Sequence, residues 1–205
     1  MGFDVDSIIK TVGYFGLFLI IFAETGLLLG FFLPGDTLLI SAGLLIQQDK
    51  VNLELWFLIP LLIAAAILGD AVGYQIGKHT GPRLFKRADG RIFKREHLDR
   101  AKRFYDKHGG KTIVIARFLA FIRTFAPTVA GAAEMPYARF AAFNAIGAIL
   151  WVPSLTFLGY FFGKAIPANL VDVFFVGLLG VMVLASVIPA LIHLWRQRRR
   201  ANSAA

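Results

Sequence analysis

The sequence predicts an all-α membrane protein in which two re-entrant, broken-helix hairpins accompany about three full transmembrane helices. The first observation is composition: 57% of the 205 residues are hydrophobic and the mean hydropathy is +0.66, which together with long uncharged runs is typical of integral membrane proteins. The second is that proline and glycine interrupt two of the apolar runs. The third is that these interrupted runs hold four embedded ionisable residues, Glu24, Asp36, Arg117 and Arg123. We expect a single membrane domain.

The residue types that are missing narrow the chemistry. The chain has no cysteine, which excludes disulfides, thiolate metal sites and a cysteine nucleophile. Its four histidines fall at the edges of the predicted membrane segments, and no pair has convincing metal-ligand spacing, so we expect no metal and no other cofactor. Asp4 and Asp6 stand where a signal peptide would carry positive charge, so cleavage is not expected.

The first predicted element is a broken hairpin. Residues 11–33 are apolar apart from Glu24, then Pro34-Gly35-Asp36 interrupts, and residues 37–46 resume for only ten positions. A transmembrane helix needs roughly 20 apolar residues, so this second run is too short to cross. A re-entrant hairpin or a discontinuous helix fits, and such backbone is tolerated at membrane depth where protein or a water-filled cavity covers it.

The first full crossing is predicted over residues 55–77, where Asp70 is the one charge. We expect Gly81-Pro82 to end this helix. A strongly basic segment, 78–111, follows with twelve Lys and Arg against four acidic residues, a net charge of +8. Its pattern over 92–108 predicts an amphipathic helix on the membrane surface.

The positive charge is best explained by orientation, because basic segments next to apolar spans stay in the cytoplasm. We therefore expect segment 78–111 and the arginine-rich tail to be cytoplasmic and to contact anionic lipid head groups. Nucleic-acid binding is not expected from this distribution.

The second broken hairpin is predicted at 112–135, with a bend near Pro127 that lets Arg117 and Arg123 converge. Pro136 is expected to open the next helix. Two uncharged runs then follow that are long enough to cross the membrane, 140–163 and 173–195.

The number of crossings supports the second hairpin. If segment 78–111 and the tail are both cytoplasmic, the chain between them crosses an even number of times. The last two helices supply those crossings, so the second hairpin must enter and leave on the same side. By the same logic, if 11–46 is also a hairpin, the N-terminus lies outside, but the sequence does not decide the side of the N-terminus. The expected parts are a first hairpin with its crossing helix, the basic segment, a second hairpin with its crossing helix, and the last helix with its tail: 11–77, 78–111, 112–163 and 164–205.

The two halves of the chain share short motifs. Gly73-Tyr-Gln-Ile-Gly77-Lys78 recurs as Gly159-Tyr-Phe-Phe-Gly163-Lys164, and residues 41–43 resemble residues 129–131. With the topology above, the two copies have opposite orientation. This predicts an inverted repeat, which many secondary transporters use to form a site near the middle of the bilayer. Glycines spaced four apart on the first crossing helix also permit close helix packing, within one chain or in a homo-oligomer.

The embedded charges are the candidate site. Insertion scales place a charged residue at a helix centre about 2.5–3.5 kcal/mol uphill, so each needs water, a partner or a substrate. Arg117 and Arg123 can hold a phosphate group through paired N–H donors; the alternative is a salt bridge to Glu24 or Asp36 that ties the hairpins together.

The carboxylates have alternative interpretations of their own. Embedded carboxylates commonly relay protons, which makes Glu24, Asp36 and Asp70 candidates for proton coupling. Asp36 could instead cap the short helix that follows it. Asp70 could instead bind neighbouring backbone or the Tyr74 hydroxyl.

These motifs resemble the DedA family of bacterial inner-membrane proteins, relatives of the eukaryotic VTT-domain proteins. The resemblance covers about residues 15–165. It rests on the four embedded charges and on a set of small, aromatic and polar positions between them and after them: Pro34-Gly35, Gly69-Asp70, Gly73-Tyr74, Gly77, Ala116, Phe118, Ala130-Gly131, Met135-Pro136, Phe140, Asn144, Gly147, Trp151, Gly159-Tyr160 and Gly163. One departure is Ala120, where the family commonly has proline.

The resemblance implies two facing membrane hairpins in the bacterial inner membrane. It also implies movement of a phospholipid or a lipid carrier such as undecaprenyl phosphate between leaflets, coupled to the proton motive force. We therefore expect a lipid-transporting protein and not an enzyme. The residues leave three alternatives open: a proton-coupled transporter of small solutes or ions, a membrane enzyme acting on lipid phosphate, and a scaffold for other membrane proteins.

Overall fold

The computed structural model describes residues 5–26, 35–51, 53–86, 102, 103, 105, 107 and 109–165, all of which belong to one compact unit, Met1–Ala165. The predicted last crossing at 173–195, the tail and most of the predicted surface helix at 92–108 lie outside the described residues.

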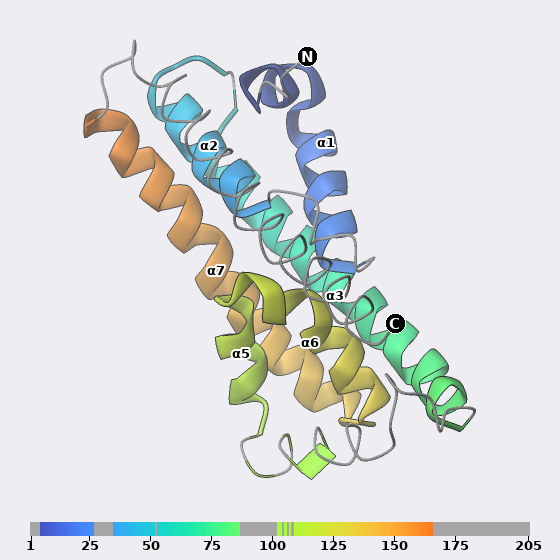
Figure 1. The fold of residues 1–205 in the computed structure, drawn as a ribbon. Coiled ribbons are helices and arrows are strands. Elements are labelled where there is room, and N and C mark those ends of the chain that lie inside the picture. Colours follow the sequence, from blue (N-terminus) through green and yellow to red (C-terminus); the bar gives the residue numbers. More distant parts are fainter. Residues whose placement is uncertain are drawn as a thin grey trace, which may run out of the picture. The chain divides into compact units, whose positions relative to one another are not determined.

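The described part of the chain is mainly helical and contains no strand, which confirms the all-α class. In chain order the helices are α1 (Val5–Gly26), α2 (Gly35–Gln47), α3 (Leu55–Lys86), α5 (Lys111–Arg117), α6 (Ala120–Ala132) and α7 (Tyr137–Ala165) (Figure 1). Two of them, α3 over Leu55–Gly81 and α7, are long and apolar enough to cross a membrane.

The two long helices begin or end differently from the predicted crossings. The α3 helix does not stop at Gly81-Pro82 but continues to Lys86, so that prediction was wrong. Close packing against α6 accompanies the extra turn, since a Cβ at Gly81 would lie 2.6 Å from the Cβ of Ala132. Pro136 does precede α7, and its carbonyl accepts the Phe140 N–H at 3.0 Å.

The break in the second hairpin lies earlier than predicted. The α5 helix ends at Arg117 and α6 begins at Ala120, with Leu119 extended between them at φ −108° and ψ 99°. Pro127 lies inside α6. The predicted bend near Pro127 was therefore wrong: the two turns that carry the arginines belong to different helices separated by an extended residue.

Helices from the two halves of the chain pack in exchanged pairs. The α2 helix packs along α7, and α6 packs along α3. The α1 helix packs on α3, and α5 packs on α7. The α3 and α7 helices also contact each other, as do α1 with α2 and α5 with α6. Two packing sets can be defined from these pairs: set A contains α1, α3 and α6, and set B contains α2, α5 and α7.

Glycines allow the backbones of α2 and α7 to touch in set B. A Cβ at Gly43 would overlap the carbonyl oxygen of Thr156, and a Cβ at Gly159 would overlap that of Ile40. No side chain other than hydrogen fits at these two positions without moving a helix. Such small-residue contacts are how membrane helices reach close van der Waals packing.

The same device joins α3 to α6 in set A. A Cβ at Gly77 would overlap the carbonyl oxygen of Thr128, and a Cβ at Gly131 would overlap that of Tyr74. The α1 helix reaches α3 through Gly26, whose added Cβ would lie 2.8 Å from the Gly69 carbonyl oxygen. The glycines spaced four apart on α3 thus serve packing within the chain.

One end of the described unit contains the start of α1, the end of α2, the start of α3 and the end of α7. The Glu54 N–H donates to the Tyr14 hydroxyl at 2.6 Å. Nearby in the chain, the Gln48 amide donates to the Gly163 carbonyl at 3.4 Å. The first half of α1 therefore lies beside the start of α3, and the end of α2 lies beside the end of α7.

The opposite end contains the start of α5, the end of α6, the end of α3 and the start of α7. A Cβ at Gly110 would overlap the ring of Phe143, and Gly81 lies against Ala132. Figure 1 shows the two short helix pairs entering from opposite ends of α3 and α7 and approaching each other midway.

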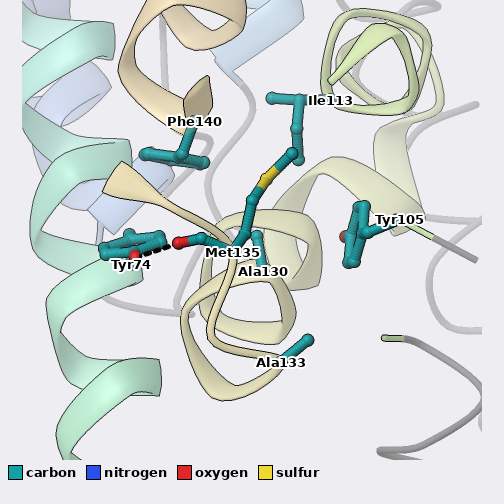
Figure 2. Close-up of a cluster of buried hydrophobic side chains, with 7 residues drawn as sticks. All are labelled: Tyr74, Tyr105, Ile113, Ala130, Ala133, Met135 and Phe140. Atoms are coloured by element: carbon teal, nitrogen blue, oxygen red, sulfur yellow. Dashed lines mark hydrogen bonds between the residues drawn. The ribbon is translucent and has the colours of Figure 1, made fainter. Parts of the chain in front are cut away.

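A buried apolar cluster closes this second end (Figure 2). It consists of Tyr74, Tyr105, Ile113, Ala130, Ala133, Met135 and Phe140. The Tyr74 hydroxyl donates to the Met135 carbonyl, and the Tyr105 hydroxyl donates to the Ala126 carbonyl at 3.4 Å. Burial raises the pKa of Tyr105 to about 12. The cluster joins α3, α5, α6 and the start of α7.

Four described residues fall in the predicted surface helix. Lys102, Arg103 and Lys107 are exposed, whereas Tyr105 is buried in the cluster. This alternation agrees with an amphipathic segment whose apolar side is held by the protein. Lys102 forms an exposed salt bridge of 3.7 Å with Glu134.

Large apolar side chains cover much of the outside of the unit. They include Trp56, Phe57 and Leu68 on α3, Ile115 on α5, and Ile146, Ile149, Leu150 and Phe161 on α7. Trp56 is 87% exposed. An apolar exterior around a buried polar interior is the distribution expected for a protein surrounded by lipid.

Candidate functional site

The ends of the two short helix pairs meet in the interior and carry the embedded charges. Glu24 lies in the last turn of α1, and Asp36 lies in the first turn of α2. Arg117 is the last residue of α5, and Arg123 lies in the first turn of α6. Each charge is therefore near a helix terminus.

Arg123 joins the two short helix pairs, α1–α2 and α5–α6. One terminal nitrogen donates to Asp36 Oδ1, and the other donates to Glu24 Oε1 at 2.6 Å. Glu24 is 2% exposed, and the Arg123 side chain is 12% exposed. Charge-assisted hydrogen bonds of this kind are short and strong where water is excluded. The salt bridge to Glu24 or Asp36 that the sequence left as the alternative is thus present at Arg123, which binds both.

Local backbone places both carboxylates at this point. A Cβ at Gly35 would overlap the Glu24 carboxylate, so the glycine of Pro34-Gly35-Asp36 lets α1 and α2 close around that side chain. Asp36 stands in the first turn of α2, where the helix macrodipole favours a negative charge. Its carboxylate also accepts the Trp151 indole N–H at 3.0 Å.

Arg117 has a different set of partners. One terminal nitrogen contacts Asp70 Oδ2 at 2.5 Å, and the other donates to Asn144 Oδ1 at 2.8 Å and to the Asn144 carbonyl at 2.9 Å. The predicted alternative had paired Arg117 with Glu24 or Asp36, but the structure pairs it with Asp70. Asp70 therefore faces the site, and the Tyr74 hydroxyl binds Met135 instead.

Asn144 and Trp151 were not predicted as site residues, although both belong to the motifs above. They are seven positions apart on α7, so they lie on the same face of that helix. Asn144 also donates to the Ile67 carbonyl at 3.2 Å. An amide in an otherwise apolar membrane run, followed two turns later by tryptophan, is the sequence signal that could have identified them.

Trp151 contacts both arginines through its ring. The Arg123 guanidinium carbon is 4.8 Å from the ring centroid, and that of Arg117 is 5.6 Å away. Both distances are within the range of cation–π attraction. The structure thus brings together all five predicted site residues and adds Asn144 and Trp151 from α7.

A small cavity of about 20 Å³ adjoins these side chains. It is lined by Glu24, Asp70, Arg117, Arg123 and Trp151, together with Thr25, Ile113, Thr124, Ala126 and Pro127. This volume is enough for about one water molecule. The arrangement as it stands is therefore a closed one, with each guanidinium occupied by carboxylates of the same chain.

The charges in the site nearly cancel. Two arginines face three carboxylates, so the site has a formal charge of −1 when all five groups are ionised. One proton would make it neutral. Within the described residues, no group of three or more His, Asp and Glu side chains is placed to hold a metal ion.

Comparison with known proteins gives the family. Residues 33–161 match the VTT domain. The chain is 48% identical to protein DedA of Escherichia coli K12, covering 92% of this chain and 85% of that protein. It is 42% identical to the inner membrane protein YqjA of the same strain, covering 74% and 68%.

A further relative comes from another bacterial group. An uncharacterized membrane protein of Mycobacterium leprae is 41% identical, over 91% of this chain and 81% of the relative. No solved structure matches the chain. The domain match, the identity to protein DedA and the apolar helices lead to one conclusion: the chain is a membrane protein of the DedA family, built on the VTT domain.

Proposed function

We propose that this protein moves a phosphate-bearing lipid between the two leaflets of the bacterial inner membrane, with coupling to the proton motive force. The observation that carries the proposal is Arg123, which is held between two carboxylates from the other half of the chain in the buried interior between apolar helices. A guanidinium that binds two carboxylates presents the same donors that bind phosphate.

The proposed membrane arrangement makes α1–α2 and α5–α6 two re-entrant hairpins. Support comes from the contacts at their open ends, which place each pair beside a single end of α3 and α7. The protein would then be multi-pass, with segment 78–111 and the C-terminus in the cytoplasm and close to anionic lipid. A homo-oligomer is compatible with this arrangement.

The two halves of the proposed fold form an inverted repeat. Its support is the matched packing of Gly159 on Ile40 and of Gly77 on Thr128. The sequence motifs had aligned Gly159 with Gly73, so the packing favours a register that differs by one helical turn. The α2–α7 pair and the α6–α3 pair thus make matching contacts. In an inverted repeat, such corresponding pairs come from the two halves of the chain and have opposite orientations in the membrane.

The proposed motion separates set A from set B. Within each set, glycines bring backbones into contact, which resists sliding. Polar bonds between the sets include Arg123 to Asp36, Arg117 to Asp70 and to the Ala66 carbonyl, and Asn144 to the Ile67 carbonyl. Arg123 to Glu24 lies within set A, and Arg117 to Asn144 lies within set B. Opening the site would break the bonds between the sets and keep the two bonds within them.

A phosphate head group would take the place of Asp36 on Arg123 and of Asp70 on Arg117 while its tails remain in hydrocarbon. Protons taken up by Glu24, Asp36 or Asp70 would compensate the incoming negative charge, because the closed site is already at −1. A membrane potential supplies about 2.3 kcal/mol per charge per 100 mV, which is enough to bias this exchange.

The test is lipid transfer in proteoliposomes that contain fluorescent or isotopically labelled undecaprenyl phosphate or phospholipid, with and without a pH gradient. Wild-type protein should speed transfer, and Arg117→Ala and Arg123→Ala should abolish the increase. The exposed Arg139→Ala serves as the matched control. Equal transfer by the two site variants and the control rejects the head-group role, and the absence of transfer by the wild type with either lipid rejects the function.

The volume of the cavity favours a second candidate, a proton-coupled transporter of small solutes or ions. A space of about 20 Å³ holds one water molecule and no head group. Proton or ion flux into liposomes without lipid transfer would support it. Release of phosphate from lipid by the purified protein, which we do not expect, would instead support an enzyme.

A further inference from the structure

We propose that Trp151 is a positioning residue that keeps Arg123 and Asp36 in place while a phosphate group exchanges with the carboxylates. This inference rests on the proposed function, because it names the device that keeps the same site ordered during exchange. It concerns a residue that carries no charge and was not among the predicted site residues.

The indole makes two different kinds of contact. Its N–H edge donates to Asp36 Oδ1 at 3.0 Å. Its ring faces the Arg123 guanidinium at 4.8 Å and the Arg117 guanidinium at 5.6 Å. Trp151 is 2% exposed and so is held tightly by its surroundings. One rigid side chain thereby touches both cations and one carboxylate.

These contacts leave the hydrogen-bonding edge of each arginine available. A guanidinium stacked on an aromatic face keeps its N–H donors in its own plane, where a carboxylate or a phosphate can reach them. Arg123 binds Glu24 and Asp36 through its terminal N–H donors, while its guanidinium carbon lies over the Trp151 ring. Replacing the carboxylates by phosphate therefore need not disturb the contact with Trp151.

The exchange begins while the two sets are still in contact, and it breaks the bond between Arg123 and Asp36. Arg123 then keeps Glu24 as its one carboxylate partner, and Asp36 loses its cation. The ring face keeps the first group in position, and the indole N–H keeps the second. The indole offers an aromatic face for a cation together with an N–H donor for a carboxylate; phenylalanine has the face without the donor, and leucine has neither.

The competing interpretation is that Trp151 only fills space. The two can be separated with Trp151→Phe, which keeps an aromatic face but loses the donor, and Trp151→Leu, which loses both. Trp56→Phe is the matched control, because Trp56 is 87% exposed and is not one of the residues that contact the site charges. Each variant is reconstituted, and the initial transfer rate is measured against lipid mole fraction at several pH values.

We expect the lipid mole fraction for half-maximal rate to rise about three- to tenfold in Trp151→Phe, which loses one hydrogen bond, and further in Trp151→Leu, which also loses the cation–π contact. The pH profile of the rate should also shift in both, because Asp36 loses its donor. The control should match the wild type. Half-saturation and pH profiles equal to the wild type in both Trp151 variants would overturn the proposal.

A second measurement covers the case in which the Trp151 variants do not fold. The chain has three tryptophans, so the double variant Trp56→Phe with Trp195→Phe has Trp151 as its single tryptophan, and its emission can be excited selectively. Detergent-solubilised protein is titrated with dodecyl phosphate, with dodecyl maltoside as the phosphate-free amphiphile.

We expect a saturable change in Trp151 emission with dodecyl phosphate and no such change with dodecyl maltoside. Arg123→Ala should abolish the change. An emission that stays constant during saturable binding, or the absence of binding, overturns the proposal. The fluorescence response without any lipid transfer would instead count against transport while leaving the positioning role intact. The two failures are therefore distinguishable.

Discussion

Arg123 and Asp36 are 87 positions apart in the sequence, yet their side chains form an ion pair in the interior between the two short helix pairs. The same guanidinium also binds Glu24. This three-residue bridge links the end of α1 and the start of α2 to the start of α6. Its contribution to stability can be separated from its contribution to transport.

Removing the cation alone should be costly. Arg123→Met leaves Glu24 and Asp36 unpaired, and breaking a buried pair typically costs about 3–5 kcal/mol. The midpoint of thermal unfolding in detergent should fall clearly. Adding Glu24→Gln and Asp36→Asn to the same protein should restore most of it, because no buried charge is then left. A single variant that melts with the wild type would show that the bridge does not stabilise the fold.

Two glycines on α3, one turn apart, should respond oppositely to alanine. At Gly73 the nearest atom to an added Cβ is the Pro127 Cβ at 3.4 Å, so Gly73→Ala should fold and melt like the wild type. At Gly77 the Cβ would overlap the Thr128 carbonyl, so Gly77→Ala should cost about 1–3 kcal/mol by overpacking. Equal melting temperatures of the two variants would contradict the α3–α6 contact.

Asn144 should be needed to hold α5 in place. Asn144→Leu removes the acceptor that Arg117 uses at 2.8 Å and the donor to the Ile67 carbonyl, which should cost about 1–3 kcal/mol. Amide hydrogen exchange in α5 should speed up before it does in α7. Gln75→Leu, on an exposed position of α3, is the control and should leave exchange in α5 unchanged.

Cross-linking within set B should leave transport intact. A Cβ at Gly163 would lie 3.0 Å from the Gln47 Cβ, close to the distance that a disulfide requires. The natural chain has no cysteine, so Gln47→Cys with Gly163→Cys gives one defined disulfide between α2 and α7. Lipid transfer should be the same before and after reduction. Transfer that appears only on reduction would mean that α2 and α7 separate during the cycle.

The sequence was sufficient to identify the charged residues that meet in the site, but not Asn144 and Trp151. Charges in apolar segments need partners, so Glu24, Asp36 and Arg123 could be expected to converge even though they are far apart in the chain. The choice of partner for Arg117 was different, because Asp70 and Asn144 lie on helices whose relative rotation no local pattern reveals. Geometry between packed helices decided that pairing.

Backbone breaks were harder to place. Proline is the usual signal for a bend or a helix end, so the sequence predicted a bend near Pro127 and a helix end at Gly81-Pro82. The structure instead breaks the chain at Leu119, which carries no such signal, and keeps both proline positions helical. Tertiary packing by neighbouring helices compensates for a missing hydrogen bond at proline, so the local rule fails where such packing is available.

Exchanged packing has a consequence for biosynthesis. The face of α2 that contains Gly43 finds its partner only in α7, which the ribosome makes long after α2 has left it. Until α7 has been made, α1 and α2 remain in the bilayer or beside the insertion machinery, and that face of α2 has no helix packed against it. Neither half of the chain can complete its interior alone, so the two halves produced as separate polypeptides should become protease-resistant only when they are made together.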